Sequence, residues 1–294
     1  MKSGVKRTTP YKVISIIILV ILAILFLFPL YWIVTGAFKP TTDIYASQPV
    51  WWPSEWVTSN FEKLFTKRSA PLFEIGALVG PTVPAAIRWL VNTVFMSVAA
   101  MLLTCITAAM AGYALAKKRF VGRTLLFSLI ICAMALPKQV ILIPLLKEMS
   151  ALKLYGSLWA VIFPTVGWPF GVFLMKQFCE SVPGEMLEAA RIDGASEART
   201  FTQIVVPLIK PGIGALAIFT FINSWNDYFM QLVMLPNSAN FTISLGIATL
   251  QGESSVDTGL LMSGAALAAV PIIVVFLIFQ KYFTQGITMG AVKG

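Results

Sequence analysis

The chain has 294 residues, of which 57% are hydrophobic and only 12% carry a charge. A soluble domain carries about 25% charged residues, so this composition predicts a polytopic membrane protein and excludes a large soluble domain. The formal net charge is +9. The basic residues lie beside apolar runs, which indicates membrane orientation rather than nucleic-acid binding.

Catalytic chemistry has little support in this sequence. It contains no histidine, which excludes His-based catalytic triads and most transition-metal sites. It also lacks the G-x-x-x-x-G-K-[ST] phosphate loop, so the chain does not hydrolyse ATP by that route. We expect no catalytic residue, no metal site and no enzymatic activity in this chain.

The apolar runs predict an all-α polytopic fold with six transmembrane helices in a single domain, residues 1–294. The spans lie at about residues 13–36, 88–116, 120–137, 157–176, 204–230 and 260–280. Of the 22 Lys and Arg residues, fourteen fall in segments that this topology places inside, seven fall outside, and Lys138 is unassigned. The excess inside predicts that both termini are cytoplasmic.

The third span has two interpretations. Its uncharged run stops at Pro137 and Lys138, and residues 139–146 are apolar again. Either the helix continues with Lys138 inside the membrane, where it would belong to a transport pathway, or the helix ends near Pro137 and a short interfacial helix follows. We favour the second, because proline and a charge are a poor pair in the middle of a membrane helix.

The fourth and fifth spans carry the candidate pathway residues. Pro164, Gly167, Pro169 and Gly171 interrupt the fourth span, so we expect it to line a central cavity, although a harmless kink is the alternative. The outer end of the fifth span holds Asn223, Trp225, Asn226, Asp227 and Tyr228. These side chains would contact a passing hydroxylated substrate, or they mark a helix end that reaches water or packs against a partner.

The polar stretch between these spans, residues 181–203, predicts a helix, a tight turn and a second helix on the cytoplasmic face. Pro183 suits a first helical turn with Ser181 as its cap, and Glu188 can pair with Arg191 three residues later. Asp193 and Gly194 end this helix. Ser196 can cap the next.

The same stretch carries a family pattern. Glu188-Ala189-Ala190 is followed by three residues and Gly194, then by nine residues and Ile204, and ends at Val206-Pro207. This spacing resembles the EAA loop of ABC-importer transmembrane permeases, in which Leu-Pro stands at the position of Val206-Pro207. Residues 89–93 and 111–117 resemble the carbohydrate-uptake branch of that family, similar to the inner-membrane permease subunit of maltose-type transporters.

The resemblance implies a type I ABC importer fold, with a cytoplasmic coupling helix in loop 181–203 between the fourth and fifth spans. Glu188, Ala189, Ala190, Asp193 and Gly194 would couple this helix to an ATPase. The chain would then be the transmembrane subunit of an ATP-driven, binding-protein-dependent importer of a sugar or oligosaccharide, and would form half of the translocation pathway.

The resemblance also implies the partners. We expect two ATP-binding subunits that bind ATP and Mg²⁺, a second permease subunit that is a different chain, an extracytoplasmic solute-binding protein and membrane lipid, with no cofactor in this chain. Gly290 and Lys293 would contact the ATPase, and Gln251, Gly252 and Glu253 would contact the binding protein. The implied location is the bacterial cytoplasmic (inner) membrane.

Three alternatives remain open. The same fold could carry an amino acid, a phosphate or a metal instead of a sugar. A secondary transporter or channel would need intramembrane charges for ion coupling, and only Lys138 and Asp227 qualify. A membrane enzyme would need paired carboxylates, a nucleophile with its base or metal ligands at one depth, and the sequence shows none.

Overall fold

The computed structural model describes residues 10–75, 78–251 and 256–291, and it divides into two compact units. Unit 1 contains residues 1–68 and 251–267, and unit 2 contains residues 69–250 and 268–294. Within the described residues, four helices are long and apolar enough to cross a membrane. Two bent helix pairs raise that number to six if each pair is one span. The fold is therefore helical with four to six candidate spans.

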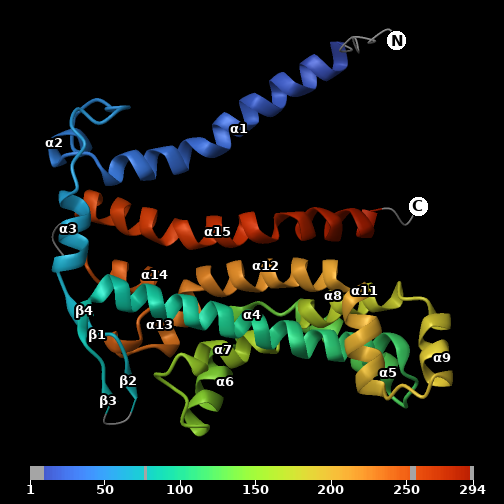
Figure 1. The fold of residues 1–294 in the computed structure, drawn as a ribbon. Helices are drawn as coiled ribbons and strands as arrows, with labels where there is room; N and C mark the ends of the chain where they lie inside the picture. Colours follow the sequence, from blue (N-terminus) through green and yellow to red (C-terminus); the bar gives the residue numbers. More distant parts are fainter. Residues whose placement is uncertain (1–9, 76–77, 252–255, 292–294) are drawn as a thin grey trace. The chain divides into compact units, whose positions relative to one another are not determined.

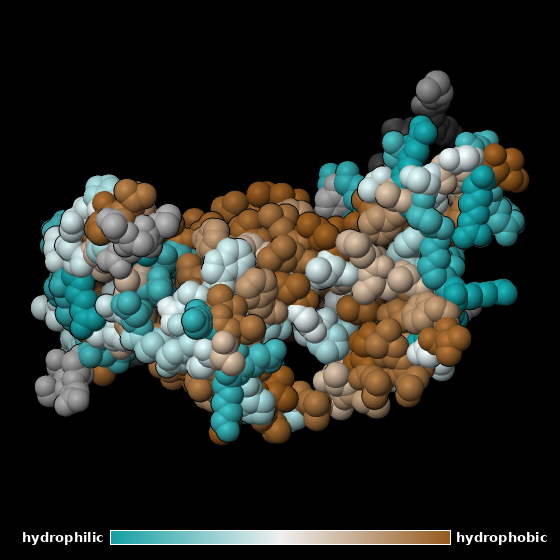
Figure 2. Space-filling view, turned by 90° about the horizontal axis from the view of Figure 1, so that it is seen from below, coloured by the Kyte–Doolittle hydropathy of each residue, from teal (hydrophilic) through white to brown (hydrophobic). Residues whose placement is uncertain are grey.

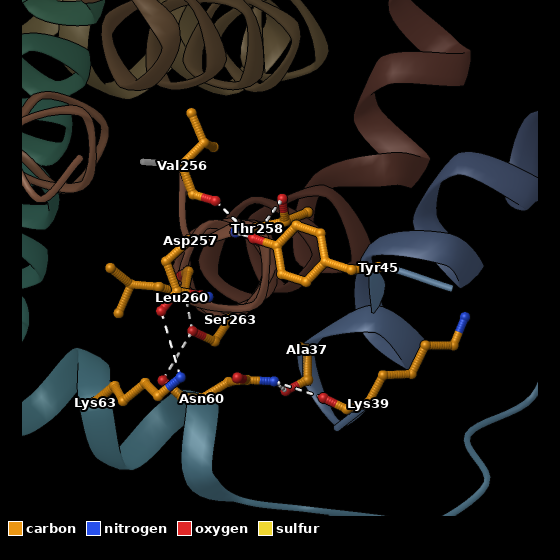
Figure 3. A network of polar contacts seen from close by, with 10 residues as sticks. All are labelled: Ala37, Lys39, Tyr45, Asn60, Lys63, Val256, Asp257, Thr258, Leu260 and Ser263. Atoms are coloured by element: carbon orange, nitrogen blue, oxygen red, sulfur yellow. Dashed lines mark hydrogen bonds and ion pairs between the residues drawn. The ribbon is translucent and has the colours of Figure 1, made fainter. Parts of the chain in front are cut away.

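Unit 1 holds the first apolar helix and a folded loop. Its elements are α1 (Pro10–Ala37), α2 (Thr41–Ile44), α3 (Ser59–Thr66) and the first turns of α15 (Thr258–Ala291). Asn60, which is buried, donates hydrogen bonds to the carbonyl oxygens of Ala37 at 3.1 Å and Lys39 at 2.9 Å (Figure 3). Ser263 of α15 donates to the carbonyl oxygen of Asn60 at 3.3 Å. One asparagine thus holds the end of α1, the start of α3 and α15 together.

Two further contacts fix the segment before α15 in unit 1. The Tyr45 hydroxyl donates to the carbonyl oxygen of Val256 at 2.6 Å, and Lys63 lies 3.4 Å from the Asp257 carboxylate (Figure 3). Asp257 also accepts a hydrogen bond from the Leu260 backbone at 3.0 Å, within the first turn of α15. Residues 39–68 therefore pack as part of a defined unit.

Unit 2 is built around α4 (Ala85–Lys117), which packs against α7 (Trp159–Val166), α8 (Pro169–Glu180) and α12 (Lys210–Asn226) (Figure 1). Close approach of α4 and α8 depends on Gly112. A Cβ at this position would lie 2.7 Å from the Met175 carbonyl carbon and from the Lys176 backbone nitrogen. Small residues allow this kind of close packing between membrane helices.

Besides the later turns of α15, unit 2 contains shorter elements that connect these helices. They are β1 (Ser69–Pro71), β2 (Glu74–Ile75), β3 (Leu78–Val79), β4 (Thr82–Pro84), α5 (Arg123–Met134), α6 (Lys138–Ala151), α9 (Gly184–Ile192), α10 (Glu197–Thr200), a π-helical turn (Phe201–Val205), α11 (Val206–Leu208), α13 (Tyr228–Met234), a 3₁₀ turn (Ser238–Asn240) and α14 (Ile243–Ala248). β1 pairs with β4 and β2 with β3, both antiparallel. The short strands lie at one end of α4 and α9 lies at the other (Figure 1).

These short strands depart from the all-α expectation. They occupy residues 69–84, which the sequence presents only as a Pro-rich polar loop, and a pairing of two or three residues leaves no periodic pattern to detect. Figure 2 shows hydrophobic side chains over the surface between the end that carries the strands and the end that carries α9. That distribution agrees with a membrane protein whose polar segments lie at the two ends of its helices.

The third span follows the interpretation favoured from its proline. α5 ends at Met134 and α6 begins at Lys138, and the two helices are bent by 109°. Pro137 stands immediately before α6 as its N-cap and has the extended backbone angles that are usual at that position. Lys138 is therefore at the start of a helix and not inside a continuous one.

Candidate functional site

The segment 181–203 contains a tightly defined turn after α9. Gly194 has a φ of +72°, which L-residues with a side chain rarely adopt. The N–H of Ala195 donates to the carbonyl of Ala190 at 2.9 Å, and the N–H of Gly194 donates to the carbonyl of Arg191 at 3.1 Å. This pair of bonds is the Schellman pattern of a helix that ends in glycine. The turn expected at residues 193–194 is thus held by the backbone itself.

The two serines of this segment behave differently. Ser196 accepts a hydrogen bond from the Arg199 backbone at 3.3 Å and caps α10, as its position predicts. The prediction that Ser181 caps α9 is wrong. Its hydroxyl donates to the carbonyl of Phe178 at 2.8 Å, at the end of α8. The reason is that Ser181 keeps helical backbone angles, whereas an N-cap needs extended ones, and Pro183 has those.

The side chains of α9 point in two directions. Ala190 is only 5% exposed, and Leu187 packs against the core of unit 2. Glu188 and Ala189 are exposed, and so is Ile192 at 86%. Of the two alanines expected at the coupling surface, only Ala189 is therefore available to a partner, while Ala190 packs inward. Asp193 and Gly194 are exposed as well.

Glu197 connects this segment to the end of α4. Tyr113 donates to Glu197 Oε2 at 3.2 Å, and Lys118 forms an ion pair with the same oxygen. Arg191 of α9 lies 3.5 Å from Oε1. The hydrogen bond from Lys118 outweighs burial and holds the pKa of Glu197 below its ordinary value. The expected pair of Glu188 with Arg191 does not form, because the turn brings Glu197 to Arg191 instead.

A cavity of about 540 Å³ lies where three helices are interrupted. The interruptions are residues 135–137 between α5 and α6, Gly167 and Trp168 between α7 and α8, and Asp227 between α12 and α13. Each break frees backbone polar groups, which a membrane protein tolerates where they line a cavity. Of the four helix breakers expected to line a cavity in the fourth span, Pro164, Gly167 and Pro169 line this one, whereas Gly171 packs against α4 and α12.

An ion pair spans the cavity wall. Lys138 Nζ at the start of α6 lies 3.0 Å from Asp227 Oδ2 and donates to Asn223 Oδ1 at 3.3 Å. The second carboxylate oxygen of Asp227 accepts the backbone N–H of Met230 at 3.3 Å and so caps α13. The pair joins the break between α5 and α6 to the break between α12 and α13.

The structure separates the five expected pathway residues. Asn223 and Asp227 line the cavity, and together with Asn226 they also line an adjoining hollow of about 550 Å³. Trp225 is only 1% exposed and stacks on Phe221, with ring centroids 5.4 Å apart. Tyr228 is 40% exposed and lines neither space. A helix of 3.6 residues per turn cannot place five nearly consecutive side chains on one face.

Other residues of the cavity were not among the expected pathway residues. Phe163, Thr165, Trp168 and Phe170 contribute to its wall. Their signal in the sequence was the group of helix breakers among them, which indicated a cavity but not the side chains that face it. Lys138 was assigned to a pathway only if it lay within a continuous span; it reaches the cavity from the start of α6.

The remaining expected contacts lie at the edge of the described chain. Gln251 is exposed, while Gly252 and Glu253 lie outside the described residues. Gly290 falls in the last turn of α15, and Lys293 lies outside the described residues.

The sequence of this chain matches a known protein family and several of its members. The model for "Binding-protein-dependent transport system inner membrane component" matches residues 107–289. The arabinooligosaccharides transport system permease protein AraQ of Bacillus subtilis is 32% identical over 97% of this chain and 96% of its own length. The trehalose transport system permease protein SugB of Mycobacterium tuberculosis is 28% identical over 99% of this chain and all of its own length.

A solved structure shows the same fold. A chain of a bacterial ABC transporter involved in the import of the acidic polysaccharide alginate superposes with a TM-score of 0.75 at 21% identity, covering 96% of this chain and 99% of that one. A chain of the MetNI methionine ABC transporter matches with a TM-score of 0.53 at 15% identity, over 69% of this chain and 96% of that one. The family model covers more than half of the sequence, and the chain belongs to the family of binding-protein-dependent transport system inner membrane components.

Proposed function

We propose that this chain is the transmembrane subunit of an ATP-driven importer for a sugar or oligosaccharide and forms half of its translocation pathway. The names of its relatives support a carbohydrate: arabinooligosaccharides, diacetylchitobiose and trehalose. The fold shared with an ABC importer chain supports the mode of transport. The energy for transport would come from ATP hydrolysis by partner subunits, since this chain has no phosphate loop of its own.

The observation that carries this proposal is a direct connection between α9 and the cavity. The turn at Gly194 is followed by α10, the π-helical turn and α11, and then by α12. α12 ends at Asn226, beside the cavity residues Asn223 and Asp227. Its 17 residues correspond to a rod of about 25 Å. A displacement of α9 by a partner would therefore be delivered to the cavity wall through packed helices, as rigid-body alternating access requires.

The exposed side of α9 is the proposed docking surface for an ATP-binding subunit. Glu188 and Ala189 lie on it, followed by Ile192. Asp193 and Gly194 fix the turn that follows. Gly290 and Lys293 are proposed as a second ATPase contact on the basis of family resemblance alone. ATP and Mg²⁺ would bind the partner, and this chain would need no cofactor.

The complete transporter would contain two ATP-binding subunits, a second permease chain and an extracytoplasmic solute-binding protein. Residues 251–253 are the proposed contact with the binding protein. We place six spans in the bacterial inner membrane with both termini in the cytoplasm, so that α9 faces the ATPase. Counting each bent helix pair as one span supports six.

Reconstitution tests the proposal. The chain is purified with the products of neighbouring transporter genes and placed in proteoliposomes, and uptake of labelled arabinose disaccharide, trehalose, amino acids and phosphate is measured. We expect uptake of a saccharide that requires both ATP and the binding protein. Uptake of amino acids or phosphate alone would contradict the assigned cargo, and uptake driven by an ion gradient without ATP would contradict the ABC mechanism.

A further inference from the structure

The cavity is charge-balanced. Of all the residues that line the cavity and the adjoining hollow, only Lys138 and Asp227 carry a formal charge. Their charged atoms are 3.0 Å apart, and the Asp227 side chain is only 15% exposed. The wall contributed by this chain therefore has no net charge, and its anion is largely withdrawn from solvent.

The hydrogen-bonding groups left over in this wall suit hydroxyl groups. Both oxygens of Asp227 are occupied, one by Lys138 and one by the backbone of Met230. An ammonium has three N–H donors, and Lys138 uses two, on Asp227 and Asn223. Within the described residues, the amide nitrogen of Asn223 has no protein partner. The amide nitrogen of Asn223 and one N–H of Lys138 remain to meet a ligand.

The rest of the wall is aromatic and apolar. Phe163, Trp168 and Phe170 belong to it, and the rings of Trp168 and Phe170 have centroids 4.9 Å apart. Apolar walls with a few placed polar groups are typical of small-molecule sites. The C–H face of a sugar ring is apolar and its rim carries hydroxyls, which fits this division of the wall.

We propose that the Lys138–Asp227 pair is a specificity-determining element that restricts this cavity to uncharged saccharides. The proposal rests on the proposed function and adds the charge of the cargo. An acidic sugar that reaches the spare N–H of Lys138 would bring its carboxylate beside that of Asp227, so that two anions would share one ammonium at a partly buried site, which is costly. A repulsive element of this kind sets specificity by acting against the wrong ligand.

The first test measures the charge of the wall without any cargo. The complete transporter is prepared with Cys132→Ser and Met134→Cys, because Met134 lines the cavity, and the new thiol is treated with an anionic and a cationic methanethiosulfonate. We expect the ratio of the two reaction rates, anionic reagent to cationic reagent, to be similar to the ratio for a free thiol in solution. Asp227→Asn should shift this ratio several-fold towards the anionic reagent, and Lys138→Met should shift it several-fold towards the cationic reagent. The double variant should have the ratio of the unsubstituted transporter.

The second test measures transport. We measure uptake of a neutral disaccharide and of its uronic acid analogue. Each uptake rate is divided by the fraction of binding protein that carries that sugar, so that the selectivity of the permease is separated from that of the binding protein. We expect the neutral sugar to pass at least about tenfold better, each single variant to lower its uptake about tenfold, and the double variant Lys138→Met with Asp227→Asn to recover most of it. Lys147→Met and Glu148→Gln, which remove exposed charges of α6 outside the cavity, should have no effect.

Each outcome decides the proposal. Single variants that match the unsubstituted transporter would overturn it, as would equal passage of the acidic sugar or a reagent ratio that ignores the substitutions. A double variant as inactive as the singles would show that the pair is needed for folding and not for charge balance. These results differ from failure of the proposed function, in which the unsubstituted transporter would take up no saccharide at all.

Discussion

The hydroxyl of Tyr113, near the end of α4, donates a hydrogen bond to Oε2 of Glu197, 3.2 Å away at the start of α10. Lys118 pairs with the same carboxylate, and Arg191 of α9 lies 3.5 Å from its other oxygen. Glu197 thus connects α9, α10 and the central helix of unit 2. Motion of α9 can reach α4 through these side chains in addition to the backbone route through α12.

The first prediction concerns Glu197→Ala. Because this carboxylate is largely exposed, each of its contacts is worth little alone, and we expect the number of sugar molecules taken up per ATP hydrolysed to fall only about two- to fivefold. The measurement is uptake and phosphate release in the same proteoliposomes. Glu148→Ala, which removes an exposed carboxylate from α6, is the control. An unchanged ratio in Glu197→Ala would show that α4 is not driven through this residue.

The pKa of Glu197 gives a second prediction. The hydrogen bond from Lys118 lowers this pKa, so the link contributes stability above the unfolded value, about 4.3, and loses it as the pH falls through the folded value. The unsubstituted protein should melt at a higher temperature than Glu197→Gln at pH 7, and the difference should shrink below about pH 4. A difference that grows on acidification would contradict this assignment.

The turn at Gly194 gives a matched pair of glycine variants. A Cβ at Gly194 would meet no atom within 4 Å, but φ is +72°, so Gly194→Ala should cost about 1–2 kcal/mol through the backbone alone. A Cβ at Gly184 also meets nothing, and its φ is not positive, so Gly184→Ala should be tolerated. We expect Gly194→Ala to leave membrane insertion intact and to lower uptake more than ATP hydrolysis. Equal behaviour of the two variants would remove the turn from the coupling account.

Local features of this segment could be predicted from the sequence, and contacts between distant residues could not. The positive φ of Gly194 and the cap by Ser196 depend on a few neighbouring residues whose types restrict the backbone. The direction of Ala190, the burial of Trp225 and the partner of Arg191 depend on which face of a helix meets which neighbour. Lys138 and Asp227 are 89 residues apart, and only the assembled helix breaks bring them together. The likeness to a known family supplied the fold where periodicity alone could not.

Close packing of α4 on α8 gives a fourth prediction. A Cβ at Gly112 would lie 2.7 Å from backbone atoms of α8, which cannot move as a flexible side chain can. We expect Gly112→Ala to destabilise the protein by about 1–3 kcal/mol, seen as a lower melting temperature in detergent. Gly171→Ala is the control, since its Cβ would make only ordinary 3.4 Å contacts and helix propensity favours alanine. A higher melting temperature for Gly112→Ala would mean that the two helices are further apart than described.

The exposed side of α9 is the surface on which the coupling account depends, and two adjacent alanines test it. Ala189 is exposed, whereas Ala190 is 5% exposed and faces the core. Cysteine is placed at either position in a chain whose own three cysteines are replaced. The complete transporter is then treated with a short thiol crosslinker against single cysteines on the ATP-binding subunit. We predict that Ala189→Cys forms a crosslink to that subunit whose yield changes with ATP, and that Ala190→Cys forms none. The account would be contradicted if neither cysteine formed a crosslink, or if both reacted only with reagents added outside the cell.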